Sequence, residues 1–193
     1  MPRAGLDRDA VLTAAIAIAD RHGVSGLTMS GLAEALNVRP PSLYSHFDGL
    51  ASIEDALTLR GLEGLLAAAH EAIAGLAGEA ALEALARSHR NYALAHPGLY
   101  SATLRHPEDR SPEIRSAGTA YLHVVLAILK GYGLHGEPAL HATRCLHAAL
   151  RGFVTLELNR GLGLNISVEE SFETLLKVLE AGIANIAGRT SAG

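Results

Sequence analysis

The sequence has 193 residues, a formal net charge of −4 at pH 7 and one cysteine, Cys145. A single cysteine excludes an internal disulfide, and no uninterrupted apolar run reaches the ~20 residues that a membrane-spanning helix needs. Because the first residues also lack a charged-then-apolar leader, we expect a cytoplasmic protein that buries a hydrophobic core without covalent staples.

The composition predicts an all-α fold. Alanine and leucine, which are strong helix formers, are abundant, whereas aromatic residues make up only 4% of the chain. Prolines stand at the edges of the expected helices. The alternating apolar pattern of strands bounded by turn residues is missing.

The first fifty residues have the pattern of three helices. The first is expected at 7–22, with Gly23 as its stop, and Thr28 can cap a second that ends at Leu36. A tight turn follows, and two prolines start a short third helix over 40–47, because proline is tolerated in the first helical turn. Two helices joined by a tight turn predict a helix-turn-helix.

Apolar residues at helical spacing continue along the rest of the chain. Ser52 and Asp55 resemble a capping box, so a long helix is expected at 52–74. Further helices are expected at 79–96, up to Leu104, at 111–132, at 138–160 and after a cap at Ser167. We therefore divide the chain into an N-terminal domain, 1–51, and a C-terminal domain, 52–193.

The segment around the tight turn carries a specific run of residues. It reads Leu-Thr-Met at 27–29, Leu-Ala-Glu-Ala-Leu at 32–36, then Val38, and Pro-Ser-Leu-Tyr-Ser-His-Phe at 41–47. Over roughly residues 7–57 the chain thereby resembles the tetracycline-repressor (TetR) family of bacterial regulators. The stretch 150–157 also looks like a C-terminal subgroup of that family, which usually reads His-Gly where this chain has Arg151-Gly152.

The resemblance implies a transcriptional regulator that works as a homodimer. Its N-terminal domains would bind operator DNA, and its C-terminal helical domains would hold the dimer and a pocket for a small hydrophobic effector. Effector binding would spread the two recognition helices, so that they no longer fit the major groove, and the protein is expected to be a repressor. We expect no cofactor.

Polar side chains near the tight turn suit contacts with DNA. The guanidinium of Arg39 can donate two hydrogen bonds to a guanine edge, and short hydroxyls can reach a base or a phosphate. Tyr44 and His46 suit phosphate contacts, which set register rather than sequence. Leu43 and Phe47 are expected in the core, and the alternative for the polar residues is a solvated face. The expected DNA-binding residues are Thr28, Ser30, Arg39, Ser42, Tyr44, Ser45 and His46.

The N-terminal region carries little positive charge for a DNA-binding domain. Residues 1–60 hold five basic and seven acidic side chains. Leu50 stands where the family commonly has a lysine, and Ser30 where an arginine is frequent. Each missing cation weakens binding and flattens its salt dependence, so we expect weak or strongly site-dependent binding. The alternative is a helical ligand-binding or protein-interaction dimer with weakened or lost DNA binding.

An organic-effector pocket is expected among the helices between residues 79 and 160. Such pockets are mainly apolar with a few polar groups, although each candidate can also belong to an ordinary helix-packed core. The expected ligand-binding residues are Tyr92, Tyr100, Tyr121, His123, Cys145, His147 and Phe153.

The last helix carries the strongest amphipathic stripe of the chain. We expect this helix and the one over 138–160 to form a four-helix bundle with their counterparts across a twofold axis, with an intrachain core as the alternative. The expected dimer-interface residues are Phe172, Leu176, Leu179 and Ile183.

Metal binding and enzymatic activity are both disfavoured by the sequence. His141 and Cys145 share a helix face with His147 nearby, but a zinc or copper site needs three or four close ligands. No phosphate-binding loop, dinucleotide fingerprint or metalloprotease motif is present, and the Glu169-Glu170 pair fits a helix N-terminus better than acid–base chemistry. We therefore expect neither a metal site nor an enzyme.

Overall fold

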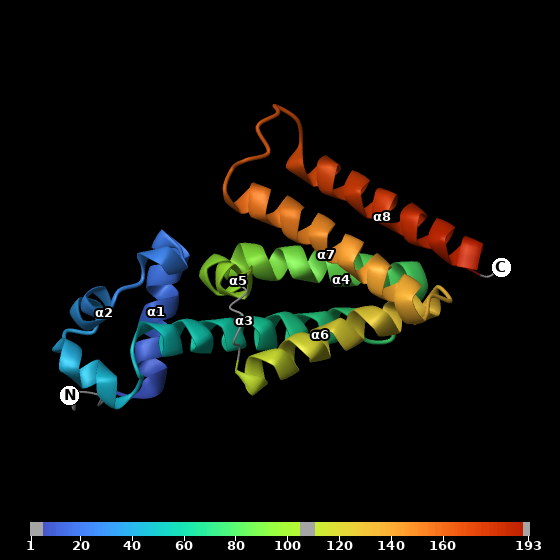
Figure 1. Ribbon diagram of the computed structural model, residues 1–193. Helices are drawn as coiled ribbons and strands as arrows, with labels where there is room; N and C mark the ends of the chain where they lie inside the picture. The colour runs from blue at the N-terminus through green and yellow to red at the C-terminus, as the bar shows by residue number, and fades with distance from the viewer. Residues whose placement is uncertain (1–5, 105–110, 191–193) are drawn as a thin grey trace. The chain divides into compact units, whose positions relative to one another are not determined.

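The computed structural model describes residues 6–104 and 111–190, and all regular secondary structure in these ranges is helical (Figure 1). The all-α fold class is therefore confirmed. The elements are α1 (Arg8–His22), η1 (Val24–Gly26), α2 (Met29–Ala35), η2 (Pro40–Ser45), α3 (Leu50–Ile73), α4 (Gly78–Ala95), α5 (Pro97–Leu104), α6 (Pro112–Gly131), α7 (Gly136–Leu158) and α8 (Val168–Thr190).

The chain divides into two compact units. The first comprises residues 1–64 and 95–117, and the second comprises 65–94 and 118–193. Helices α3, α4 and α6 contribute residues to both units. The boundary expected after residue 51 falls just inside the start of α3, whereas the compact first unit also takes the first half of that helix.

Side-chain caps define the helix starts in the first unit. The Asp7 carboxylate accepts from the Ala10 N–H at 2.7 Å, and Thr28 Oγ1 accepts from the Gly31 N–H at 3.0 Å. Gly23, with a φ of 72°, ends α1 as expected. The expected third helix is present as the 3-10 helix η2. These elements share one core, in which Val11, Leu32, Leu43 and Phe47 are buried, and α1 packs against α2 and α5.

Helix α3 starts two residues before the expected capping box. Gly49 has a φ of 99°, and this backbone conformation lets the helix begin directly at Leu50. The Ser52 hydroxyl donates to the Gly49 carbonyl at 2.9 Å rather than accepting from a first-turn N–H. The prediction of Ser52 as a helix cap was therefore wrong.

In the second unit, α7 and α8 lie side by side (Figure 1). Helix α8 begins after the expected cap, since Ser167 Oγ accepts from the Glu170 N–H at 3.2 Å. In the part of the chain that the structure describes, no single helix is long and apolar enough to cross a membrane. Helices α6 and α7 reach that threshold only as a pair bent by 114°.

Two glycines of the first unit allow helices to approach closely. A Cβ atom at Gly98 would lie 2.5 Å from the Asp20 backbone nitrogen, and one at Gly61 would lie 2.6 Å from the Leu99 carbonyl oxygen. The Gly98 N–H also donates to the Asp20 carboxylate at 2.7 Å. The packing of α5 on α1 therefore depends on the absence of a side chain at Gly98.

We expect Gly98→Ala to lower the free energy of unfolding by about 1–3 kcal/mol, because backbone must move to admit the methyl group. Urea unfolding followed by circular dichroism measures this change. The control is Gly118→Ala in α6, where an added Cβ meets nothing within 4 Å. That variant is expected to be neutral or stabilised by up to about 1 kcal/mol, and equal losses in both variants would contradict the close-packing argument.

Candidate functional site

The segment η2 separates buried apolar residues from exposed polar ones. Leu43 is fully buried and Phe47 is 2% exposed, so both belong to the core of the first unit as expected. The Tyr44 side chain, which lies between them in sequence, is 56% exposed. The short helix is therefore anchored through one face, and the opposite face is turned outward.

The other side chains expected to contact DNA also lie at the surface of this segment. Arg39, Ser42 and Ser45 are exposed, and His46 is half-buried. The Ser45 hydroxyl donates to the Ser42 carbonyl at 2.8 Å, so its oxygen remains as an acceptor. The structure thus groups Arg39, Ser42, Tyr44, Ser45 and His46 in eight consecutive residues on one anchored element.

Thr28 and Ser30 lie at the start of α2, the first helix of the motif, and both are exposed. The Thr28 oxygen already accepts the Gly31 N–H, so its hydroxyl hydrogen is the part available for a phosphate. The Ser30 side chain has no such capping role.

Arg8 is a residue of this site that the sequence did not reveal. Its guanidinium lies 4.2 Å from the centre of the Phe47 ring, and Nη1 donates to the His46 carbonyl at 3.1 Å. The cation on α1 thus holds the end of residues 39–47, which we call the recognition segment. Arg8 and His46 are 38 positions apart, and no local sequence pattern predicts such a contact.

Leu50 is half-buried and packs against the core of the first unit. It is the first residue of α3, three positions after Phe47. At this position the chain has an apolar core contact in place of a cation.

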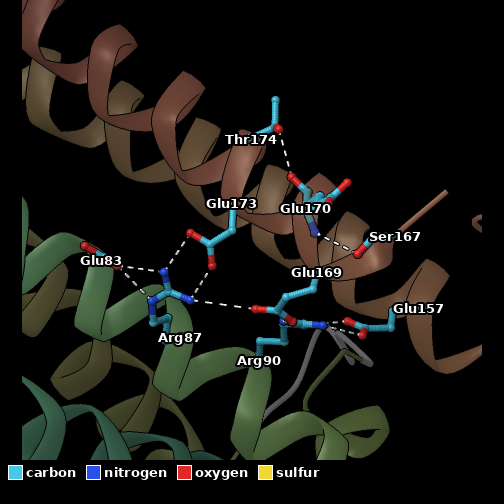
Figure 2. A network of polar contacts seen from close by, with 9 residues as sticks. All are labelled: Glu83, Arg87, Arg90, Glu157, Ser167, Glu169, Glu170, Glu173 and Thr174. Carbon is cyan, nitrogen blue, oxygen red and sulfur yellow. Dashed lines mark hydrogen bonds and ion pairs between the residues drawn. The ribbon is translucent and has the colours of Figure 1, made fainter.

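In the second unit, Arg90 of α4 binds carboxylates from two other helices (Figure 2). Its Nε and Nη2 donate to Glu157 of α7 at 2.8 and 2.7 Å, and Nη1 donates to Glu169 of α8 at 2.6 Å. The guanidinium also lies 4.6 Å from the centre of the Phe172 ring. The side chains of Arg90 and Glu157 are 10% and 15% exposed, so this pair is largely shielded from water.

Arg87, one turn earlier on α4, forms a more exposed set of ion pairs. It binds Glu173 of α8 through two hydrogen bonds of 2.6 and 2.8 Å, and it also binds Glu83 of its own helix (Figure 2). These bonds raise the pKa of Arg87 and lower the pKa of Glu173 from their ordinary values. Hydrogen bonds to Glu157 and Glu169 likewise raise the pKa of Arg90 although burial opposes the rise.

A second polar cluster lies in the interior of this unit. His89 of α4 is 2% exposed, and its Nδ1 lies 2.9 Å from the Tyr121 hydroxyl of α6. The Tyr121 ring is 5.8 Å from the ring of His147 on α7. The charge of Arg151, one turn further along α7, acts on both histidines.

Burial keeps the two histidines uncharged near neutral pH. Removal from water, reinforced by the charges of Arg151 and His147, lowers the pKa of His89 to about 3. Burial and Arg151 lower the pKa of His147 to about 4. Tyr121 and His147 belong to the ligand-binding set expected from the sequence. His89 and Arg151 were not predicted, and the structure places them in the same cluster.

The remaining residues expected to bind ligand are dispersed. Tyr100 is fully buried in the first unit, and the Phe153 ring packs on Phe172 at 5.4 Å. Tyr92 is half-buried, whereas His123 and Cys145 are exposed. Of this set, the structure brings Tyr121 and His147 together in a defined polar cluster.

A cavity of about 220 Å³ opens between α4, α7 and α8. Its apolar wall includes Leu82, Leu146, Leu176 and Leu179, and four glutamates and Lys177 also line it. None of the residues expected to bind ligand lines this cavity. Leu176 and Leu179, which were expected at the dimer interface, do line it.

The residues expected at the dimer interface differ in exposure. Phe172 is fully buried and Ile183 is 4% exposed within one chain, so these side chains offer a partner almost no surface. Leu176 and Leu179 are half-buried. On the outer surface of α8, Val178 is 62% exposed.

The histidines do not gather into a metal-binding group in the ranges 6–104 and 111–188. No set of three or more His, Cys, Asp or Glu side chains there could hold an ion. His141 is exposed and lies 3.4 Å from Glu137 of the preceding turn.

An anchored recognition segment in a helix-turn-helix, followed by a helical unit, defines the class of helix-turn-helix transcriptional regulators. Residues 11–57 match the family described as bacterial regulatory proteins, tetR family, and residues 82–179 match the tetracyclin repressor-like C-terminal domain. The chain belongs to the TetR family, which confirms the resemblance. The members of this family are regulators rather than enzymes.

Two relatives match almost the whole chain. The HTH-type transcriptional regulator YobS of Bacillus subtilis is 34% identical over 182 residues, which cover 94% of this chain and 95% of the relative. An HTH-type regulator of Mycobacterium tuberculosis is 35% identical over 181 residues, which cover 93% and 83%. Both relatives are described as uncharacterized.

Solved structures support the fold. A protein of unknown function from Rhodococcus superposes with a TM-score of 0.80 at 23% identity, covering 95% of this chain and 99% of that one. The TetR family regulator PfmR of Thermus thermophilus superposes with a TM-score of 0.68 at 21% identity, covering 91% and 96%.

We expect Arg90→Met to destabilise the protein by on the order of 3 kcal/mol, because it leaves the shielded Glu157 carboxylate without its counter-charge. Thermal and urea unfolding measure the loss. Arg87→Met is the matched control on the same helix, and its more exposed ion pairs should contribute only about 0–1 kcal/mol. A larger loss for Arg87→Met than for Arg90→Met would contradict this ranking.

We expect acid to destabilise the protein partly through His89. The pKa of His89 is lower in the folded protein than in the unfolded chain, so on acidification the unfolded chain binds the proton first. The contribution of neutral His89 to stability is therefore fully present above about pH 6.5 and is lost as the pH falls towards 3. His89→Gln should reduce the slope of unfolding free energy against pH by up to about 1.4 kcal/mol per unit in that range. Urea unfolding at several pH values measures the slope. The exposed His123→Gln variant is the matched control, and an unchanged slope in His89→Gln would refute the assignment.

Proposed function

We propose that this protein is a ligand-responsive repressor that binds operator DNA as a homodimer. The observation that carries the proposal is the exposed polar face of η2. Leu43 and Phe47 anchor this segment because both are buried in the core of the first unit. The residues proposed to contact DNA are Thr28, Ser30, Arg39, Ser42, Tyr44, Ser45 and His46. Arg39 would read a base edge, and the hydroxyls and His46 would fix the register on phosphates.

Arg8 is proposed as a positioning residue for this contact. Its guanidinium is occupied by the Phe47 ring and the His46 carbonyl, both at the end of the recognition segment. It fixes the direction of that segment, and its charge still adds to the local positive potential near the proposed phosphates.

The effector is proposed to bind among the helices of residues 52–193. Support comes from the buried polar cluster around Tyr121 and His147, because a few polar groups in apolar surroundings characterise small-molecule sites. The other proposed contacts are Tyr92, Tyr100, His123, Cys145 and Phe153. Without effector, the two recognition segments would lie about 34–36 Å apart, one turn of DNA. The effector would favour a wider spacing that does not bind DNA, to the extent that it binds that state more tightly.

The dimer is proposed to form through α7 and α8, in a symmetric contact of the kind most homodimers use. Support comes from exposed apolar side chains on these helices, since Leu140 and Leu156 of α7 and Val178 of α8 are 48–62% exposed. Of the residues expected from sequence, Leu176 and Leu179 retain partly exposed surface, whereas Phe172 and Ile183 would support this face from within the chain.

A second function is supported by the low number of basic side chains in residues 1–60. Leu50 packs into the core, and residues 1–60 hold more acidic than basic side chains. A protein with these features can be a helical ligand-binding or protein-interaction dimer whose DNA affinity is weakened or lost.

The test is binding of the purified protein to a fluorescent duplex from the region upstream of its own gene, beside a shuffled duplex of equal length. We expect selective binding that weakens modestly with salt, because the recognition segment presents one arginine and no lysine. Arg39→Ala should cost about 1–3 kcal/mol and relax the preference at one base position, and Tyr44→Ala should weaken both duplexes.

The matched control is Arg21→Ala, an exposed arginine on α1 whose guanidinium donates to the Ala17 carbonyl. It removes the same charge and should leave selectivity unchanged. Sedimentation of the complex should give two or more chains per duplex, in pairs. Equal binding of both duplexes, or none at low salt, would reject the repressor and favour the second function.

A further inference from the structure

The helical unit contains one partly buried arginine that has no partner of opposite charge among the described residues. Arg151 of α7 is half-buried, and its Nε is fully covered yet makes no hydrogen bond there. In contrast, Arg87 and Arg90 each bind two or more glutamates. A covered N–H without a hydrogen-bond partner is costly, so a fold that retains one has a reason to do so.

Arg151 lies beside the polar cluster of His89, Tyr121 and His147. His147 and Arg151 are one turn apart on α7, so their side chains share a helix face. The buried Nε2 of His147 also makes no hydrogen bond to the described residues. Two covered nitrogens, one on each side chain, are therefore available on the same face.

The charge of this cluster at neutral pH is a single positive one. Burial and the charge of Arg151 together lower the pKa of His89 to about 3 and that of His147 to about 4. Both rings are thus neutral near pH 7, and of their nitrogens it is Nε2 of His147 that is covered without a hydrogen-bond partner among the described residues. The guanidinium supplies the only full charge of the four residues.

We propose that His89, Tyr121, His147 and Arg151 form an anion-recognition site that binds the carboxylate of a monoanionic organic acid. This inference rests on the proposed function, in which such an acid is the effector. The planar guanidinium fork matches the two oxygens of a carboxylate, and His147 Nε2–H offers a further donor. A doubly charged phosphate would leave one negative charge uncompensated beside one guanidinium and two neutral rings.

The acid-lined cavity between α4, α7 and α8 was the other candidate for the effector. Of its four glutamates, Glu83 and Glu173 are already neutralised by Arg87 at 2.7 and 2.6 Å. These side chains therefore maintain the packing of α8 on α4. None of the described side chains that line the cavity has a buried polar atom without a hydrogen-bond partner.

The test titrates the full-length protein with hexanoate and benzoate, and separately with hexanamide, benzamide and inorganic phosphate. The readout is the NMR signals of the His89 and His147 rings, together with calorimetry, in the absence of DNA. We expect the acids to shift both rings and to bind at least about tenfold more tightly than the amides and phosphate, as charge-assisted hydrogen bonds require.

Arg151→Gln should weaken binding of the acids roughly 10- to 100-fold, and Arg151→Lys should fall between this variant and the wild type. The matched control is Arg144→Gln, which removes an exposed arginine from the same helix and should bind as the wild type does. An unchanged melting temperature and an unchanged His89–Tyr121 signal pattern establish that Arg151→Gln remains folded. If Arg151→Gln does not fold, the comparison of acids with amides in the wild type tests whether the site prefers a carboxylate.

The inference is overturned if neither acid shifts the rings, if the amides or phosphate bind equally well, or if Arg144→Gln loses as much affinity as Arg151→Gln. Selective binding of upstream DNA without any binding of acids would refute this site and leave the proposed repressor intact. Acids that bind the cluster without changing DNA affinity would support the carboxylate site and refute its role as the effector site.

Discussion

The helical C-terminal unit depends on the guanidinium of Arg90. This one group joins α4 to α7 through Glu157 and to α8 through Glu169, and it stacks on the Phe172 ring. Helix α8 follows a glycine-rich connection, and its packing on the unit combines this polar tie with the burial of Phe172 and Ile183. Because Arg90 and Glu157 are shielded from water, the geometry of three helices is fixed at a point where bulk solvent cannot easily replace either partner.

The same unit contains two opposite uses of arginine. Around α4, positive charge is matched by carboxylates and serves to join helices. On α7, Arg151 faces two histidines that burial keeps neutral, and no described carboxylate balances it. In the proposed function, the matched charges would hold α4, α7 and α8 together, and the cluster around Arg151 would be the part that an effector changes. In the proposed function this difference matters, because an effector shifts an equilibrium only where its contacts differ between two states.

Much of the local structure could be predicted from the sequence, since its causes lie within a few residues. Caps at Thr28 and Ser167, and the glycine at the end of α1, work through side chains and backbone three or four positions apart. The start of α3 was misjudged because a backbone feature, the positive φ of Gly49, determined it instead of the Ser52 side chain.

The candidate sites were less predictable because their contacts join distant parts of the chain. The link from Arg8 to His46 spans 38 residues, and the link from Arg90 to Glu157 spans 67. Helical periodicity identifies the buried face of each helix but not which neighbour that face meets. The sequence thus pointed to Tyr121 and His147 as polar groups in an apolar region, whereas their association with His89 and Arg151 depends on how α4, α6 and α7 pack.

Few basic side chains near the recognition segment are free of contacts within the protein, and this constrains how the first unit can bind DNA. Arg8 is occupied by Phe47 and the His46 carbonyl, Arg21 by its own helix, and Leu50 occupies core space. What remains outward on the recognition segment is Arg39 together with hydroxyl groups and the partly exposed His46. In the proposed function, affinity would therefore come less from counterion release than from the fit of hydroxyls and one guanidinium to a particular groove. Such binding falls less with salt and more with a changed base pair than binding through a lysine-rich surface does.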